Sequence, residues 1–363
     1  SLDSLIFLQL SLLFKEFFLT RRKIMIVRKI KGAAYIAVAV AALCSSGVQA
    51  KDFYKMSTIA LATPFALNTT FAKIVQKYNK DIEIQVNATG AAPRHALDAA
   101  NGKTDLFFGA PSLQMLMSKG KAMFKKVKNA PKLANNLRAI FHYRIGTYNF
   151  GVYGDSGIKS LYDIKGKRVF IGPPVGVQKV VSAGFIKAVT GYEMNKDYTA
   201  VKLGFQPAMQ AFQDRQIDMM TGASNHPSSF WSQIALTNKI RFLGADDDTD
   251  WNTPKWKKQF RIPGRTPTEF GSDIYGSNQL NTKPTKTIAA YTGLYTRVGM
   301  SEDVIYKMTK TFWEHIDEMH NVAAWAKDAI NKKRIFQEAN WKYHPGALKY
   351  YKEIGLKIPA IAQ

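Results

Sequence analysis

The chain has 363 residues, with 51 Lys and Arg against 27 Asp and Glu, a formal net charge of +24, and a single cysteine. Because that cysteine, Cys44, falls within a segment that we expect to be removed, the mature chain would have no disulfide, no thiolate metal site and no cysteine nucleophile. The positive charge favours anionic partners, but the lysines are spread along the chain without the aromatic interleaving of a nucleic-acid groove, so we expect no nucleic-acid partner.

The first fifty residues have the pattern of an export signal. From Met25, a basic start over residues 28–31 precedes an apolar run over residues 33–43 and a small-x-small site that ends at Ala50. The run is too short to span a bilayer, which takes about 20 apolar residues. We therefore predict a signal peptide over residues 25–50, cleavage after Ala50 and export to the periplasm. Residues 1–24 are interpreted as upstream sequence translated from a misplaced start, with a second membrane segment as the alternative.

Strands and helices alternate in the first part of the mature chain. Residues 56–64 and 82–89 are predicted strands, and the segment 66–80 between them has the apolar spacing of an amphipathic helix. A helix over about 94–100 and a strand over 104–110 follow. This succession favours a parallel sheet with helices on its faces and a ligand crevice at the carboxyl ends of the strands.

The same alternation occurs a second time, which predicts two α/β lobes. Its predicted elements are a strand over 148–154, a short helix and strand within 155–172, a helix over 177–190, a strand over 198–203, a helix over 206–216 and a strand over 217–223. From about residue 300 the pattern is helical, over 302–319 and 321–336. We predict that residues 51–150 form the first lobe, that 151–274 form the second, and that 275–363 return to the first lobe, so that two hinge segments join the lobes.

The glycine- and proline-rich turn in 171-IGPPVGVQKVVSAGFIKAVTGY-192 lies between a strand-like run and a helix-like run. The start of a helix binds anions well, because its first N–H groups have no internal partner. A nucleotide phosphate loop would need a hydroxyl residue after Lys179, and a dinucleotide fingerprint would need glycines two residues apart, and neither pattern is present. The turn therefore predicts a helix N-terminus that is open to another ligand.

Four stretches, in matching order, resemble one family. They are 59-IALATPFALNTTFAKIV-75, 87-NATGAAPRHALDAANGKTDLFFG-109, 155-DSGIKSLYDIKGKRVFIGPPVG-176 and 343-YHPGALKYYKEIGL-356. They resemble the TAXI type of solute-binding protein, the periplasmic receptor of tripartite ATP-independent periplasmic (TRAP) transporters. The resemblance covers residues 56–356.

The resemblance implies a type II periplasmic-binding-protein fold, in which two α/β lobes, each a mostly parallel sheet flanked by helices, close over a small solute. It implies membrane subunits of a TRAP transporter as partners, and we expect a monomer. The chain departs from the family where His95 replaces a common asparagine and where Val175-Gly176-Val177 replaces a glycine-serine-glycine turn. Since these are cleft positions, the ligand could differ from those of better-known members.

The candidate ligand-binding residues come from turns after predicted strands, where free N–H groups and short polar side chains converge. Arg94 is the sharpest candidate, because a planar guanidinium can hold a carboxylate by two contacts, although a surface salt bridge is the alternative. For Asn68 and Thr69 the alternative is helix capping, and for His226 it is a histidine fixed in a turn. The complete set is Asn68, Thr69, Thr89, Arg94, Ser112, Gln114, Gln178, Asn225 and His226.

Signals of an enzyme or a metal site are weak. His315 and His320 stand five residues apart on a predicted helix and so point in different directions. The run 246-DDDTDW-251 has calcium-loop spacing, but Trp251 stands where the loop needs glycine. We therefore expect no cofactor and no metal. The leading hypothesis is a receptor for a small organic anion, such as a dicarboxylate, a 2-oxo acid or an acidic amino acid, with an aromatic or sulfonated acid as the alternative ligand. The alternative is a periplasmic hydrolase or transferase on the same scaffold.

Overall fold

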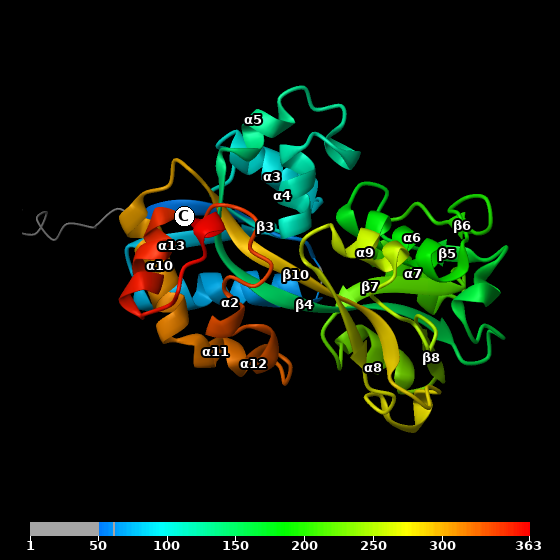
Figure 1. Cartoon of the computed structure of the whole chain (residues 1–363). Helices are drawn as coiled ribbons and strands as arrows, with labels where there is room; N and C mark the ends of the chain where they lie inside the picture. The colour runs from blue at the N-terminus through cyan, green and yellow to red at the C-terminus, as the bar shows by residue number, and fades with distance from the viewer. Residues whose placement is uncertain (1–50, 61) are drawn as a thin grey trace, which may run out of the picture. The chain divides into compact units, whose positions relative to one another are not determined.

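The computed structural model describes residues 51–60 and 62–363, and Figure 1 shows its helices and strands. The predicted upstream segment and the predicted signal peptide lie outside the described residues. Within the described part, no helix has both the length and the apolar character that a bilayer crossing requires.

A single mixed sheet runs through residues 51–363 in the order β2-β1-β3-β10-β4-β7-β5-β6, with β8 paired to β4 and β9 paired to β10. Strand β1 pairs in parallel with β2 and β3, and β5 pairs in parallel with β6 and β7. Strands β4 and β10 run antiparallel to their neighbours. The bounds are β1 Asp52–Ser57, β2 Ile82–Asn87, β3 Leu106–Gly109, β4 Leu137–Tyr153, β5 Arg168–Phe170, β6 Thr199–Ala200, β7 Met219–Ser224, β8 Ile240–Leu243, β9 Arg265–Phe270 and β10 Thr285–Arg297.

The sheet has two halves, and each half is the centre of one lobe (Figure 1). Strands β4 and β10, of 17 and 13 residues, are long enough to take part in both halves, so they form the two connections between the lobes. Nearly every residue of both strands is buried, as is typical of strands covered on both faces. The prediction of two α/β lobes joined by two segments is therefore confirmed.

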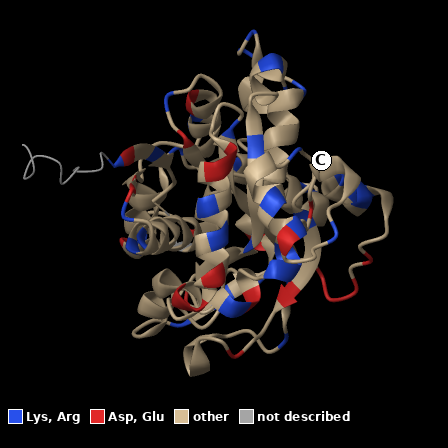
Figure 2. Ribbon diagram, turned by 90° about the vertical axis from the view of Figure 1, so that its left-hand side faces the viewer, with Lys and Arg blue, Asp and Glu red and all other residues tan. Residues whose placement is uncertain are grey.

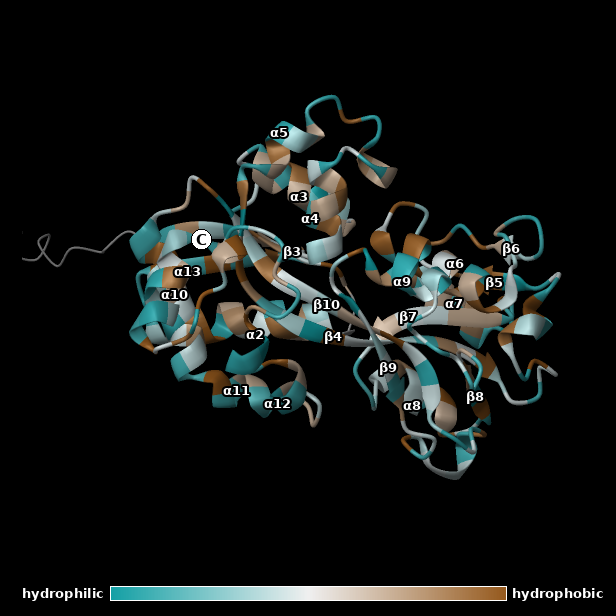
Figure 3. Cartoon of the chain, viewed as in Figure 1, coloured by the Kyte–Doolittle hydropathy of each residue, from teal (hydrophilic) through white to brown (hydrophobic). Residues whose placement is uncertain are grey.

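Helices pack on both halves of the sheet. The first lobe carries α2 Ala62–Tyr78, α3 Ala92–Ala100, α4 Pro111–Ser118, α5 Ala130–Ala134, α10 Glu302–Glu314, α11 Ile316–His320, α12 Ala326–Ala329 and α13 Pro345–Glu353. The second lobe carries α6 Val177–Thr190, α7 Phe205–Gln213, α8 Ser229–Ala235 and α9 Pro254–Phe260. Figure 3 shows hydrophobic residues along the strands and on the helix sides that face them.

Each lobe has its own apolar core. In the first lobe, the rings of Phe71, Phe141 and Phe312 pack with centroids 5.1 and 5.2 Å apart. In the second lobe, neighbouring residues of β5 face opposite sides of the sheet, as the pleat requires. Val169 joins the cluster under α6 and α9, and Phe170 joins the cluster under α7 and α8.

Several predicted boundaries need correction. The strand predicted over 56–64 ends at Ser57, and the helix predicted over 66–80 already begins at Ala62. Pro64 belongs to the first turn of that helix, where its missing N–H is not needed. The helix predicted over 302–319 is two helices that meet at His315, and only short helical pieces occupy 321–336.

Charged residues are dispersed over the described part of the chain. In Figure 2, Lys and Arg are scattered over several elements, with Asp and Glu among them. Many are paired at the surface, as Lys310 with Glu353 and Lys307 with Asp81, each at 2.6 Å. This distribution agrees with a basic solvated surface.

Candidate functional site

A cavity of about 350 Å³ lies between the lobes. Its walls come from the starts of α3 and α4 in the first lobe, from the starts of α6 and α7 in the second lobe, and from the crossing strands β4 and β10 together with β9. The crevice that the β-α-β pattern predicts at strand ends is therefore present, and its size is that of a small-molecule pocket.

Four helices begin at this cavity without a side-chain cap. The N-cap residues of α3, α4, α6 and α7 are Ala91, Ala110, Gly176 and Gly204, all of which line the cavity. Alanine and glycine have no side-chain acceptor for the first N–H groups, so those groups stay free for a ligand. The four positive helix ends give the cavity an electrostatic preference for an anion.

Helix α6 presents the fullest set of free N–H groups. Its first three residues, Val177, Gln178 and Lys179, follow Gly176 with no side-chain cap, and no proline interrupts them. The other three helices have a proline in the first turn, which removes one N–H each. The prediction that the turn before residue 177 opens a helix toward a ligand site agrees with this geometry.

Arg265 is the one charged residue among the described residues that line the cavity. It begins β9 and is only 3% exposed. Its guanidinium donates no hydrogen bond to any described residue, and the buried Nε and Nη2 atoms have no partner. Burial lowers the pKa of Arg265, and the nearby Tyr148 opposes that shift. A buried charge without a partner costs several kcal/mol, so an anion bound next to Arg265 would stabilise the folded protein.

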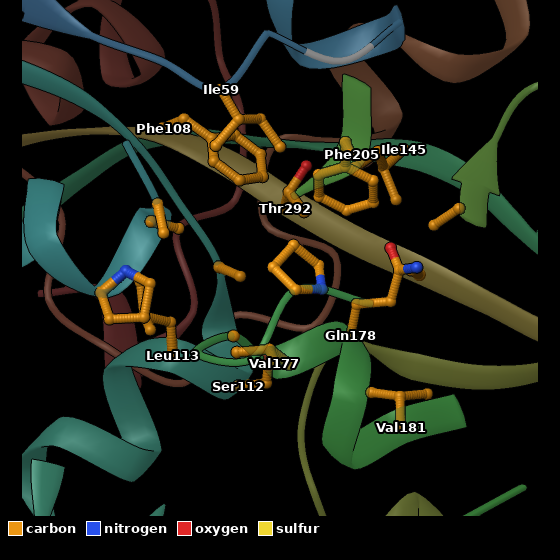
Figure 4. Close-up of a pocket in the computed structure, with 18 of the residues that line it drawn as sticks. Ile59, Phe108, Ser112, Leu113, Ile145, Val177, Gln178, Val181, Phe205 and Thr292 are labelled. Atoms are coloured by element: carbon orange, nitrogen blue, oxygen red, sulfur yellow. The ribbon is translucent and has the colours of Figure 1, made fainter. Parts of the chain in front are cut away.

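The remaining wall is mostly apolar. Tyr148 from β4 is buried, which raises the pKa of its hydroxyl to about 12. Figure 4 shows Ile59, Phe108 and Thr292 on one side of the pocket and Val177, Gln178 and Val181 of α6 on another. Beside alanines and prolines, the wall has the larger apolar side chains of Ile59, Phe108, Leu113, Ile145, Val175, Val177, Val181 and Phe205.

Two predicted site residues, Ser112 and Gln178, line this cavity. Ser112 is in the first turn of α4. Gln178 is fixed in place because its Nε2 donates a 3.0 Å hydrogen bond to the main-chain oxygen of Thr221 on β7. The structure therefore brings these two residues to one cavity from different lobes.

Three predicted residues lie inside the first lobe and do not line the cavity. Asn68 donates a 2.7 Å hydrogen bond to Thr58, and Thr69 donates one of 2.7 Å to the main-chain oxygen of Phe65 within α2. Gln114 donates to the main-chain oxygen of Ala134 at 2.9 Å. The capping alternative for Asn68 and Thr69 is wrong, because α2 begins at Ala62 and both residues lie in its interior.

Thr89 and Arg94 lie beside the cavity but do not line it. Thr89 is exposed and donates to Asn87 at 2.8 Å. Arg94 is exposed on α3 and forms a 2.8 Å ion pair with Asp98. This pairing is the surface salt bridge that the sequence left open as an alternative, and a contact of Arg94 with ligand stays a prediction.

Asn225 and His226 lie at the junction of the lobes, where both line a separate pocket of about 230 Å³. His226 accepts or donates hydrogen bonds with the hydroxyls of Tyr275 at 2.6 Å and Thr147 at 3.0 Å, and its ring stacks on Phe270. Burial lowers the pKa of His226 to about 4, and the positive charge of Arg144 adds to this shift. The side chain is therefore neutral and structurally fixed.

Neither the cavity wall nor the rest of the described chain brings together the side chains of a catalytic or metal site. No Asp, Glu, His, Lys or Cys occurs among the described residues of the cavity wall, so Ser112 has no base there. Over residues 51–60 and 62–363, no group of three His, Cys, Asp or Glu side chains could hold a metal ion.

Comparison with known proteins gives a family and a set of similar folds. A sequence model of the NMT1-like family matches residues 62–355. The binding-protein component of a phosphonate ABC transporter from Pseudomonas aeruginosa has 12% identity and a TM-score of 0.47, with 79% of this chain and 80% of that chain covered. The alkanesulfonate-binding protein from Xanthomonas axonopodis pv. citri, bound to MOPS, has 12% identity and a TM-score of 0.43, with 77% and 81% covered.

A third similar structure is a TRAP periplasmic solute-binding protein from Sulfitobacter sp. NAS-14.1 with bound β-D-galacturonate. It has 12% identity and a TM-score of 0.43, with 84% of this chain and 88% of that chain covered. All three are binding proteins of small solutes.

Proposed function

Because the chain belongs to the NMT1-like family, we propose that it is a solute-binding receptor of the TAXI type, serving a TRAP transporter in the periplasm after removal of residues 1–50. It captures a small organic anion between its lobes and delivers it to membrane subunits encoded elsewhere. It acts as a monomer in which residues 51–150 and 275–363 form one lobe and 151–274 the other. The four sequence blocks that resemble TAXI receptors support the transporter type.

The observation that carries the proposal is the unpartnered guanidinium of Arg265 at a cavity surrounded by four uncapped helix N-termini. Each of these features favours a bound anion, and both occur at the same cavity. An anion there would receive charge-assisted hydrogen bonds and would relieve the cost of the buried Arg265 charge.

Contacts from both lobes supply the driving force for closure. A ligand shifts a conformational equilibrium only by the difference in its affinity for the two states. An anion that touches Ser112 on the first lobe and Gln178 on the second makes its full set of contacts only when the lobes are close. The transporter subunits would then recognise this closed form.

The alternative, a hydrolase or transferase, would need a base or a metal at the cavity, and none of the described wall residues provides one. Thermal unfolding of purified residues 51–363 with a panel of organic acids at moderate salt tests the receptor function. A ligand at 100 times its Kd adds about 2.7 kcal/mol, which is about 4 °C for a protein of this size.

The transporter type needs a second measurement. We expect uptake of the bound acid into proteoliposomes that contain TRAP membrane subunits, driven by an ion gradient and without ATP. Uptake that requires ATP would contradict the TRAP assignment, and turnover of the acid by the purified protein would contradict the receptor function.

A further inference from the structure

We infer that the solute is a monocarboxylate with an apolar body, with the carboxylate held by Arg265 and the body enclosed between the two lobes. This inference rests on the proposed receptor function and narrows its ligand class. It replaces the dicarboxylates and acidic amino acids that the sequence first suggested.

The shape of the free donors points to a carboxylate. Nε and Nη2 of Arg265 have no partner and almost no accessible surface, so a carboxylate reaches them when the side chains over them shift on binding. The two N–H groups point along one edge of the planar guanidinium, and their spacing matches the two oxygens of a carboxylate. Lysine could not make this contact, because its ammonium is a single point charge.

The charge of the wall points to a single negative group. Arg265 is the one charged side chain among the described residues of the cavity wall, so a second carboxylate would find no cation. The helix N-termini carry only partial charges, which do not replace a cation in a buried site. The ammonium of an amino acid would be worse placed, because the wall has no carboxylate and the helix ends repel a positive charge.

The lining points to an apolar body. Side chains from both lobes form it, including Phe108 and Leu113 from the first lobe and Val177, Val181 and Phe205 from the second. A cavity of 150 Å³ already accommodates benzene. The cavity of about 350 Å³ therefore has room for one ring or a short carbon chain together with its carboxylate.

Calorimetry and thermal shift with matched probes test this inference on residues 51–363. The probes are phenylacetate and hexanoate, their neutral amides, hexanesulfonate, succinate and L-glutamate. We expect at least one of phenylacetate and hexanoate to bind. We expect its amide to bind at least 100-fold more weakly, because the amide lacks the charge that Arg265 needs, and succinate and glutamate at least tenfold more weakly.

Variants then assign the head group to Arg265. Arg265→Met is expected to reduce the affinity for the bound monocarboxylate at least 100-fold, and Arg265→Lys at least tenfold, while the unliganded Tm of Arg265→Met stays equal or rises. A residue with a purely structural role would instead lower that Tm. The control is Arg241→Met on β8, since Arg241 lies in the same lobe but does not line the cavity.

The outcomes separate the two proposals. Tighter binding of succinate or glutamate than of phenylacetate and hexanoate would overturn the monocarboxylate inference and leave the receptor function intact. Stronger binding of hexanesulfonate than of hexanoate would overturn the carboxylate head group, and an unchanged affinity in Arg265→Met would overturn the assignment to Arg265. If no acid binds, neither among these probes nor in the panel of organic acids used for thermal unfolding, both proposals are overturned.

Discussion

Asn225, which follows β7 of the second lobe, donates a 3.2 Å hydrogen bond from Nδ2 to the hydroxyl of Thr63 on α2 of the first lobe. The same amide nitrogen lies 3.3 Å from the main-chain oxygen of Arg144 on the crossing strand β4. Both Asn225 and Thr63 are buried. This side chain therefore links the lobes directly at their junction, and the ligand contact that its position after a strand suggested stays a prediction.

Replacement of Asn225 by alanine tests this link. We expect Asn225→Ala to lower the free energy of unfolding by about 1–2 kcal/mol, because a buried hydrogen bond is lost and Thr63 keeps no partner for its hydroxyl. Urea unfolding of residues 51–363 measures the change. Asn252→Ala is the control, since Asn252 is exposed and its replacement should stay within about 0.5 kcal/mol. Equal effects of the two replacements would contradict a linking role.

Gly146 sets how closely β4 approaches β7 where the chain passes between the lobes. Its φ of +125° is unfavourable for residues with a side chain, and an added Cβ would lie 2.0 Å from the main chain of Ser224. We expect Gly146→Ala to destabilise the protein by about 3 kcal/mol or more, because strain and overlap act together.

Gly166 provides the matched comparison for Gly146. It also has a positive φ, of +75°, but an added Cβ would meet nothing within 4 Å. Gly166→Ala should therefore cost only about 1 kcal/mol of backbone strain. Chemical denaturation measures both variants, and a similar loss in the two would mean that the contact with Ser224 is unimportant.

Much of the fold could be predicted because its signals are local. The alternation of apolar strands and amphipathic helices over 56–110 and again over 148–223 was sufficient to predict two α/β lobes. Contacts between distant residues could not be predicted in this way. The end of α10 before His315 is an example, since the His315 ring stacks on that of Tyr78 with centroids 3.5 Å apart. The apolar periodicity of residues 302–319 does not predict a contact with a residue so distant in the sequence.

The site could be predicted only in part for the same reason. Ser112 and Gln178 were found because helix starts after strands have a recognisable local pattern. Arg265 was missed because nothing in 261-RIPGRTPTEF-270 distinguishes it from the other arginines. Its importance comes from burial without a partner, and burial depends on strands and helices that are distant in the sequence. Arg94 had the better local pattern, because it lies near the start of a helix that follows a strand, but its side chain is exposed and paired with Asp98.

An anion supplied by the protein itself would compete with the ligand at the cavity. Ser112 is buried in the first turn of α4 and lines the cavity, so Ser112→Asp would place a carboxylate there. We expect this variant to bind the organic acid at least tenfold more weakly because of like-charge repulsion. The uncapped start of α4 should also be stabilised by about 0.3–1 kcal/mol.

Ser112→Asn is the control for this experiment, because asparagine has nearly the same shape as aspartate but carries no charge. It should keep most of the affinity in the same calorimetric titration. If Asn and Asp weaken binding equally, the effect is steric, and the electrostatic account of the cavity is wrong.

His226 makes the stability of the protein depend on pH. Its pKa is lowered to about 4 by burial and by Arg144, whereas in the unfolded chain it is near 6.5. Above pH 6.5 both states are neutral and the residue adds no pH dependence. Between pH 6.5 and 4 the unfolded chain binds a proton that the folded chain does not, so stability falls as pH falls. Below about pH 4 both states are protonated and the loss is complete.

The slope of stability against pH isolates this effect. Between pH 6.5 and 4, a histidine whose pKa is lowered in this way changes the free energy of unfolding by up to about 1.4 kcal/mol per pH unit. His142 and His344, whose pKa values are also lowered to about 4, add to the slope. We expect His226→Gln to reduce the slope of urea-unfolding free energy by about the contribution of one histidine. Tyr275→Phe removes the 2.6 Å hydrogen bond but keeps the titrating ring, so it should lower stability with little change in slope. An unchanged slope in His226→Gln would show that His226 titrates alike in both states.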